Sequence, residues 1–317
     1  MLHIINGSAA IPSLRMAFPR DDFLPWDDVL HEGPCSLLPN EEFATLRARF
    51  IHGRGWGEFD EILARFRQRD KALAQAAGKK SMVLWSTFEL YDQLHLIQIL
   101  ARCSNEGYPA PMLIFPDAYL GMMGPEEALE WFDTRQPATD QQLVLATHAW
   151  KAFCRPDPEQ FVEMLEIDTA CLPFLGAAIS RMLAEFPHPT NGLSLTQQYI
   201  LETLDKGPLT PGALFRGCRT RENPAFMGDW SFWVMVERLI TGGLVQTDDQ
   251  QSWRYEDGIP QQKVSLTKRG ERVLSGHASL LDYNSPDFWI GGVHVCPPRY
   301  HCWNPDQQEL VYKEIVP

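Results

Sequence analysis

The sequence predicts a mixed α/β protein with a Rossmann-like, mainly parallel sheet at its N-terminus, a helical connector, and a C-terminal winged-helix domain with a β-hairpin tail. Two observations predict this fold class. Short apolar segments alternate with segments of helical periodicity over roughly the first 120 residues, which is typical of a parallel sheet flanked by helices. After the proline- and glycine-containing segment 187–192, three helical segments precede two strand-like ones. We therefore divide the chain into 1–122, 123–190 and 191–317.

The N-terminal domain is expected to contain four short strands, because four apolar segments end at glycine, proline or polar residues. These strands are expected at 2–5, 23–26, 81–85 and 112–115. Helices are expected at 11–18, from Asn40 to the glycines at 53–57, at 58–77, and from Ser86 to about residue 100. Asn40 can cap its helix, and Ser86 with Glu89 matches a capping box. The arginines at 65, 67 and 69 fall on the expected solvent side of their helix.

The remaining chain is predicted to be helical up to residue 187 and mixed beyond it. Helices begin at Pro125, Thr139 and Pro158, and a further one covers 172–186. The winged-helix elements are helices at 195–204, 210–215 and 229–241, and strands at 244–246 and 264–267. The tail is strand-like over 289–295, turns at Pro297-Pro298 and returns through 310–312.

Charge and cysteine content argue against a nucleic-acid-binding chain and against a disulfide-linked secreted protein. The chain carries 41 acidic and 28 basic residues, a net charge of −13, and so repels nucleic acid as a whole. Its seven scattered cysteines fit reduced thiols better than a disulfide framework. The N-terminus lacks the pattern of a signal peptide, and no apolar run approaches the roughly 20 residues of a membrane span. We expect a cytoplasmic protein without a membrane partner.

The winged-helix segment lacks the charge expected of a DNA reader. Residues 191–275 hold ten basic and ten acidic residues, so the acidic excess lies elsewhere in the chain. The third helix, 229–241, is mostly apolar and carries Asp229 and Glu237 against a single Arg238. A DNA-reading helix normally presents Arg, Lys, Asn or Gln to the major groove. We therefore favour a packing or protein-interaction role over DNA recognition, although basic residues beside this helix remain available for phosphate contacts.

Three polar segments follow predicted strands, and ligands of α/β proteins bind beyond the carboxyl ends of parallel strands. In the first segment, Gly7 permits a close backbone approach and Ser8 can hold an anion. The second segment is the loop after strand 23–26, and the third begins at Trp85 and enters the next helix. The candidate ligand-binding residues of these segments are Asn6, Gly7, Ser8, Glu32, Gly33, Trp85, Glu89, Asp92 and Gln93. Each segment also has a simpler interpretation as a turn or a helix cap.

The loop after strand 23–26 is also the candidate catalytic centre. Asp28 and His31 suit acid–base chemistry, with His31 as general acid or base and Asp28 as its orienting partner. A nucleophilic arrangement around Cys35 is conceivable, but no spacing supports it. Four further side chains are of the types that bind zinc, but their spacing matches no standard motif: His294, Cys296, His301 and Cys302. We assign no metal. The cofactor is unknown, because dinucleotide-binding and phosphate-loop motifs are also missing from the sequence.

Several motifs resemble one bacterial family. The segments HIINGSAA, PWDDVLHEGP and VLWSTFELYDQLHLIQIL, followed by GLSLTQQYIL, LTKRG and WIGGVHV, are similar to the family called "domain of unknown function eighteen-thirty-five". The resemblance covers most of the chain and implies an α/β part joined to a winged-helix-like part. It also implies a site at Asn6, Gly7, Ser8, Asp28, His31, Gly33, Trp85, Asp92 and Gln93. Ser8 stands where the family frequently has Asp, which argues against a metal-binding role at that position.

Together these observations lead us to expect a protein that binds a nucleotide or another phosphorylated small molecule at the strand ends. Two alternatives remain open. One is a ligand-responsive transcription regulator that uses the winged helix, and the other is a protein-interaction module without catalysis.

Overall fold

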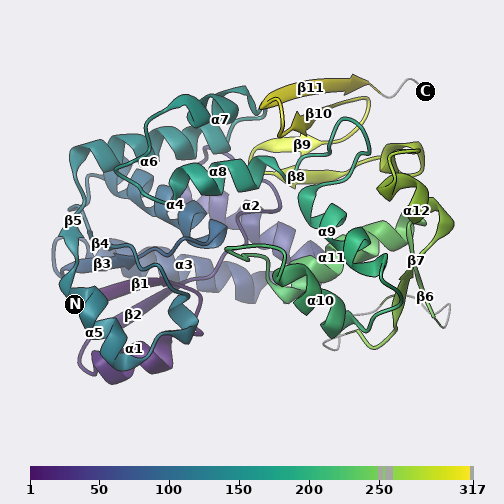
Figure 1. The fold of residues 1–317 in the computed structure, drawn as a ribbon. Helices are drawn as coiled ribbons and strands as arrows, with labels where there is room; N and C mark the ends of the chain where they lie inside the picture. The colour runs from purple at the N-terminus through teal and green to yellow at the C-terminus, as the bar shows by residue number, and fades with distance from the viewer. Residues whose placement is uncertain (249–252, 254–259, 315–317) are drawn as a thin grey trace. The chain divides into compact units, whose positions relative to one another are not determined.

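The computed structural model describes residues 1–248, 253 and 260–314 of the 317-residue chain. The chain forms two compact units, which are treated separately below (Figure 1). Unit 1 comprises residues 1–181 and 289–293, and unit 2 comprises residues 182–288 and 294–317. The described residues include no helix with the length and apolar character needed to span a membrane.

Unit 1 is built around a five-stranded sheet with the order β2-β1-β3-β4-β5 (Figure 1). Its strands are β1 (Leu2–Asn6), β2 (Asp22–Trp26), β3 (Met82–Trp85), β4 (Met112–Ile114) and β5 (Gln136–Pro137). Strands β1 to β4 run parallel, and β5 runs antiparallel to β4. The predicted mainly parallel sheet is confirmed. Because β1 pairs with both β2 and β3, the carboxyl ends of these three strands meet at one edge.

The other elements in the N-terminal part of unit 1 are helical. They are α1 (Ile11–Ala17), α2 (Asn40–Gly53), α3 (Phe59–Ala76), α4 (Leu90–Glu106), α5 (Pro125–Asp133), α6 (Asp140–Phe153), α7 (Glu159–Glu163) and α8 (Leu175–Leu183), with 3-10 turns at Leu120–Met122 and Met164–Glu166. Ile5, Val83 and Trp85 point toward α1 and α5 and share one core with them. Helix α4 packs against both β1 and α6, so most of its side chains are buried.

Two helix starts differ from the sequence prediction. Asn40 is the first residue of α2, and its side-chain amide donates to Glu106 instead of capping the helix. Helix α4 begins at Leu90 with Glu89 as its N-cap residue, so the predicted capping box is wrong. The Thr87 N–H instead donates to the Asp92 carboxylate at 2.7 Å. The Ser86 N–H, which a capping box would have bonded to the Glu89 side chain, donates to the Ile114 carbonyl oxygen at 3.0 Å.

Unit 2 contains a helical cluster followed by a hairpin, as predicted for this part of the chain. Its elements are α9 (Leu195–Leu204), α10 (Pro211–Arg219), α11 (Asp229–Thr241), β6 (Val245–Thr247), β7 (Val264–Leu266), α12 (Lys268–Leu274) and a 3-10 turn at Leu280–Asp282. Helix α9 packs against α10, α11 and α12. Its N-terminus is closed by a capping box between Ser194 and Gln197. Leu209 adds a bridge to Val264 at the edge of the antiparallel pair β6–β7.

The tail forms two hairpins, so the single strand predicted over 289–295 is wrong. The pairs are β8 (Phe288–Ile290) with β9 (Val293–Val295), and β10 (Arg299–Asn304) with β11 (Glu309–Glu314). The chain reverses at Gly291, whose φ of 57° lies in the left-handed region. A Cβ on Gly291 would lie 2.3 Å from the Phe153 carbonyl oxygen, so this turn touches the end of α6.

Candidate functional site

The first and third predicted segments meet at the carboxyl edge of the sheet. The Asn6 side chain, at the end of β1, forms a hydrogen bond with the Asp92 carboxylate of α4. Burial raises the pKa of Asp92, and the hydrogen bonds from Thr87 and Asn6 oppose that shift. The Gln93 amide donates to Ser86 Oγ at 2.9 Å and to the Thr87 carbonyl at 2.6 Å. Two buried oxygens of this edge, Asp92 Oδ1 and Gln93 Oε1, have no hydrogen-bond donor among the described residues.

The other residues of these two segments lie in different surroundings. Gly7 has a φ of 66°, and a Cβ there would lie 3.7 Å from Asp27 Oδ1. The Ser8 side chain is exposed just before the short helix α1. The Trp85 indole is buried in the core and donates to His3 Nδ1 at 3.0 Å. The structure thus places Ser8 on the surface and Trp85 in the interior.

A buried arginine organises the loop from Asp28 to Pro34. Arg47 of α2 binds the Asp28 carboxylate, with Nε 3.0 Å and Nη2 2.8 Å from Oδ1. The same guanidinium donates to the carbonyl oxygens of Val29, Glu32 and Pro34. Neither charged side chain has exposed surface. Arg47 was not predicted from the sequence, although it lies four residues after Phe43 on the buried stripe of α2.

His95 of α4 holds the same loop from a second element. Its Nε2–H donates to the Asp28 carbonyl oxygen at 2.8 Å. Burial lowers the pKa of His95 to about 4, and the hydrogen bond to Asp28 opposes that shift. The ring is therefore neutral near pH 7, and its proton lies on the nitrogen that faces the loop.

The histidine predicted as the acid or base lies inside this loop. His31 is buried, its Nε2 is 3.8 Å from Glu32 Oε1, and its ring meets Tyr91 edge-on at 4.6 Å between centroids. Glu32 therefore provides the carboxylate beside His31, whereas the expected orienting partner, Asp28, is bound by Arg47. Gly33 has a φ of 77°, and a Cβ there would overlap a neighbouring aromatic ring.

Neither the nucleophilic cysteine nor the metal site considered from the sequence is supported by the described residues. Cys35 is fully buried, and burial raises its pKa to about 12, so its thiol is protonated and a poor nucleophile. Among the residues that the structure describes, no group of three or more His, Cys, Asp or Glu side chains is arranged to hold a metal ion.

A cavity of about 270 Å³ opens beside the last residue of β2, and the sequence analysis assigned none of its residues to ligand binding. The residues around it come from β2, α2, α3, α4, α6 and the segment before α2. They are Trp26, Ser36, Leu37, Leu38, Pro39, Asn40, Phe43, Arg69, Asp70, Gln98, Arg102, Asn105, Glu106 and Trp150. We call this space the arginine cavity.

Two arginines of this cavity share one carboxylate. Arg69 Nε lies 3.0 Å and Arg102 Nη1 lies 2.7 Å from Asp70 Oδ1. Arg69 also stacks on the Trp26 ring, with its guanidinium carbon 4.1 Å from the ring centroid. Arg69 Nη1 and Arg102 Nε are buried without a hydrogen-bond acceptor among the described residues. Two cations thus share one anion and retain unfilled donors.

The predicted solvent position of Arg69 is wrong. Only 6% of this residue is exposed, because the rings of Trp26 and Phe66 cover the guanidinium. The sequence contained a signal for this, since Phe66, Arg69 and Leu73 lie at helical spacing on one stripe of α3.

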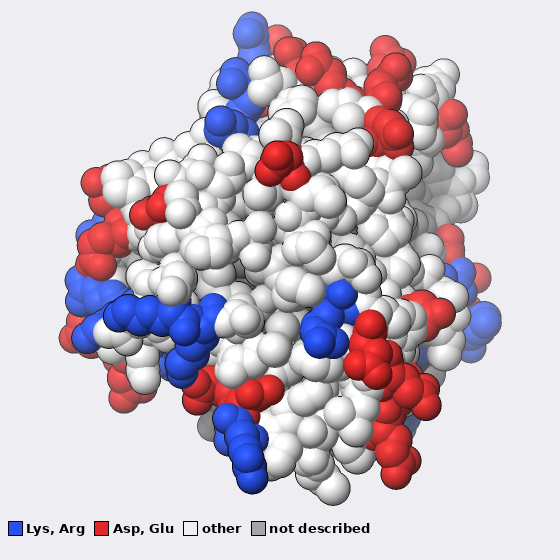
Figure 2. Space-filling model, turned by 90° about the vertical axis from the view of Figure 1, so that its left-hand side faces the viewer, with Lys and Arg blue, Asp and Glu red and all other residues white. Residues whose placement is uncertain are grey.

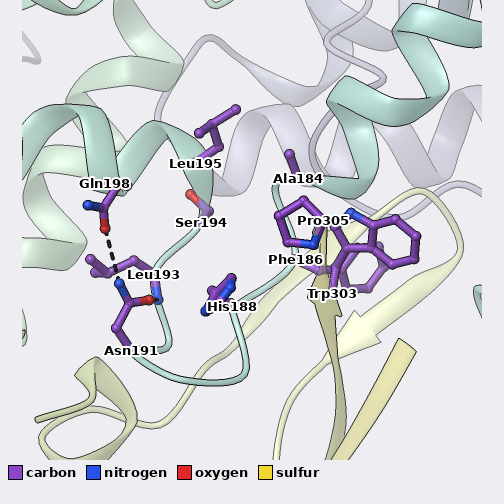
Figure 3. Close-up of a pocket in the computed structure, with 10 residues that line it drawn as sticks. All are labelled: Ala184, Phe186, His188, Asn191, Leu193, Ser194, Leu195, Gln198, Trp303 and Pro305. Atoms are coloured by element: carbon purple, nitrogen blue, oxygen red, sulfur yellow. Dashed lines mark hydrogen bonds between the residues drawn. The ribbon is translucent and has the colours of Figure 1, made fainter. Parts of the chain in front are cut away.

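Unit 2 contains a second cavity of about 270 Å³ with different chemistry (Figure 3). Its lining residues, none of them charged, are Ala184, Phe186, His188, Asn191, Leu193, Ser194, Leu195, Gln198, Trp303 and Pro305. The Asn191 amide donates to Gln198 Oε1 at 3.0 Å, as the dashed line in Figure 3 shows. His188 Nδ1 accepts from the Thr190 N–H, so the proton of the neutral ring lies on Nε2. This cavity offers no ion pair to an acidic ligand.

Figure 2 shows the face of the molecule that carries α5 and β5. A broad area in its middle is free of charged side chains, and blue and red groups lie next to one another around the margin. A nucleic-acid-binding face needs a continuous basic patch, and this face does not show one.

Comparison with family models and with curated proteins gives no match for this chain. The functional conclusion therefore rests on the chemistry of the sites described above.

Proposed function

We propose that the protein binds a small phosphorylated molecule, such as a nucleotide, and that the arginine cavity of unit 1 is its binding site. The observation that carries the proposal is the pair of guanidinium groups of Arg69 and Arg102, which share the Asp70 carboxylate and retain buried N–H donors without an acceptor among the described residues. Arginine offers planar N–H donors that match phosphate oxygens. A buried donor without a partner costs about 1–3 kcal/mol, and a phosphate oxygen in reach would remove that cost.

The aromatic lining supports a ligand with a flat part. Phe43 and Trp150 meet edge-to-face with centroids 5.8 Å apart, and Trp26 borders the same space. Binding pockets in proteins commonly measure about 300–1,000 Å³, so a cavity of about 270 Å³ favours a compact ligand.

A Rossmann-like fold of unit 1 belongs to the same proposal. It is supported by the four parallel strands in the order β2-β1-β3-β4 and by the helices between them. Trp26 ends β2, so the cavity adjoins a strand end, as expected for ligands of such sheets. The motifs that resemble the family "domain of unknown function eighteen-thirty-five" include residues of this region, and we propose membership in that family.

For unit 2 we propose a winged-helix fold with an interaction role. The order α9, α10, α11 and then the hairpin β6–β7 supports this fold, as does the bridge from Leu209 to Val264. Helix α11 buries Phe232, Trp233 and Val236, so much of its surface is committed to packing. A ligand-responsive DNA-binding regulator is the alternative, and binding of duplex DNA by the full chain would favour it.

Thermal unfolding with added ligands tests the proposed site. Inorganic phosphate, AMP, ADP and glucose 6-phosphate are the probes, and adenosine is the control without phosphate. A ligand at 100 times its Kd stabilises the native state by about 2.7 kcal/mol, so at least one phosphorylated probe is expected to raise Tm. Adenosine is expected to give a smaller shift.

Matched variants locate the effect. Arg102→Gln is expected to abolish the shift, because it removes one cavity guanidinium. Arg67→Gln, on the exposed side of α3, is expected to leave the shift unchanged. The proposal fails if no phosphorylated probe raises Tm, or if Arg102→Gln retains the full shift.

A further inference from the structure

Three side chains of unit 2 form a connected Cys-His-Asp arrangement away from both cavities. His294 lies in β9, and Cys296 follows two positions later in extended backbone, so the two side chains share a face. Asp287 precedes the paired strand β8. Cys296 Sγ lies 3.4 Å from His294 Nδ1, and His294 Nε2 lies 2.7 Å from Asp287 Oδ1.

These contacts fix the roles of the two ring nitrogens. An ionised carboxylate can only accept, so Nε2 donates to Asp287 and Nδ1 is left to accept the proton of the Cys296 thiol. A base in contact with a thiol and oriented by a carboxylate is the arrangement that activates a cysteine nucleophile. The nearby guanidinium of Arg299, whose backbone bridges to Cys296, is paired with Glu314 at 3.3 Å.

Cys296 is one of the two cysteines of the described chain that are partly exposed. Five cysteines are buried, and burial raises the pKa of each of them: Cys35, Cys103, Cys154, Cys218 and Cys302. Cys171 is partly exposed, as Cys296 is, but burial raises its pKa too and no imidazole is bonded to it. Cys171 is therefore a matched control thiol within the same chain.

We propose that Cys296 is a modification site that forms a mixed disulfide with low-molecular-weight disulfides. The thiol proton passes to His294 Nδ1, and the thiolate sulfur attacks one sulfur of the disulfide. The new S–S bond forms as the old one breaks, and the departing thiolate takes the proton back from His294. Cys296 is oxidised and one small thiol is released in reduced form. Asp287 is a positioning residue that orients the imidazole and stabilises its charged form.

Alkylation of the native full chain with iodoacetamide at pH 7, followed by peptide mass spectrometry, tests the nucleophile. Cys296 is expected to react about tenfold faster than Cys171. The expected rate ratio is smaller than that given by a buried general base, because 81% of the Asp287 side chain is exposed and water screens its charge. His294→Gln is expected to lower the Cys296 rate to that of Cys171. Asp287→Asn is expected to lower it several-fold.

Cys302, which is buried in unit 2, reports the fold of that unit through its slow reaction, and the Cys302 and Cys171 rates are expected to stay unchanged in both variants. Oxidised glutathione is then expected to leave a mixed disulfide on the Cys296 peptide that a reducing agent reverses. Equal rates at Cys296 and Cys171 would overturn the proposal. So would a Cys296 rate that His294→Gln leaves unchanged, or a glutathione adduct found only at Cys171.

Discussion

Replacing Arg47 with methionine tests whether one buried ion pair holds the loop that follows β2. Methionine keeps an unbranched apolar stem and removes the guanidinium. The Asp28 carboxylate, which has no exposed surface, then loses its only charged partner described in the structure. The carbonyl oxygens of Glu32 and Pro34 lose their Arg47 donor at the same time, whereas the Val29 carbonyl keeps its bond from the Glu32 N–H at 3.0 Å. The substitution therefore leaves a buried charge without its partner and the buried Glu32 carbonyl without this donor.

The expected loss is large compared with the stability of an ordinary domain. Removing one partner of a buried ion pair costs about 3–5 kcal/mol, and domains are stable by about 5–15 kcal/mol in total. The pair Arg67–Glu41 joins α3 to the same helix, α2, but its side chains are 56% and 58% exposed. Arg67→Met is thus a matched control, and its expected cost is much smaller, because water screens an exposed ion pair.

Urea unfolding followed by tryptophan fluorescence measures both costs. Hydrogen exchange of the backbone amides in 28–34 shows whether the loss is centred on this loop. The double variant Arg47→Met with Asp28→Leu removes both charges and is expected to recover part of the lost stability. A cost for Arg47→Met that equals that of Arg67→Met would refute the reasoning.

Two further predictions concern stability. The pKa of His95 is about 4 in the folded chain against 6.5 for the free side chain, so the unfolded chain binds the proton more readily. The neutral His95 ring therefore contributes to the free energy of unfolding. This contribution is fully present above pH 6.5, and about 3 kcal/mol of it is lost as the pH falls toward 4. Urea unfolding across this range should show it, and a chain with His95→Gln that loses stability with the same pH dependence would contradict it. Gly292→Ala should cost more than about 1 kcal/mol, because a Cβ would lie 2.3 Å from the carbonyl oxygens of Cys154 and Arg155. Gly53 lies in open space at the end of α2, so Gly53→Ala should instead stabilise the folded chain by up to about 1 kcal/mol. Equal melting temperatures for the two variants would count against the tight packing at Gly292.

The sheet of unit 1 was predictable because each of its four parallel strands is a short apolar segment ended by a turn residue. Strand β5 was not, since two residues ending in Pro137 carry no periodicity and pair only because the chain passes the edge of β4. The hairpin at Gly291 was missed for a related reason. Its flanking residues are apolar on both sides, and the reversal depends on one positive φ and on contact with α6.

Part of the candidate site followed from the sequence. Asn6 and Asp92 meet because β1 and β3 are neighbours, and strand-end reasoning places such residues together. The arginine cavity did not follow from the sequence. Arg69 and Arg102 lie on different helices, and only the packing of α3 and α4 brings both guanidinium groups to Asp70. Arginines at helical spacing usually face solvent, so no local pattern distinguishes these two.

The short segment 289–293 has a consequence for how the chain can be divided. It follows more than one hundred residues of unit 2 in the sequence, yet it belongs to unit 1. There the Gly291 carbonyl accepts from the Cys35 N–H at 2.8 Å, and the Gly292 N–H donates to the Phe153 carbonyl at 2.8 Å. No single cut in the chain therefore releases an intact unit 1. A fragment that ends at residue 181 would leave the Cys35 amide and the end of α6 without these partners, so unit 1 is complete only after residue 293 has been synthesised.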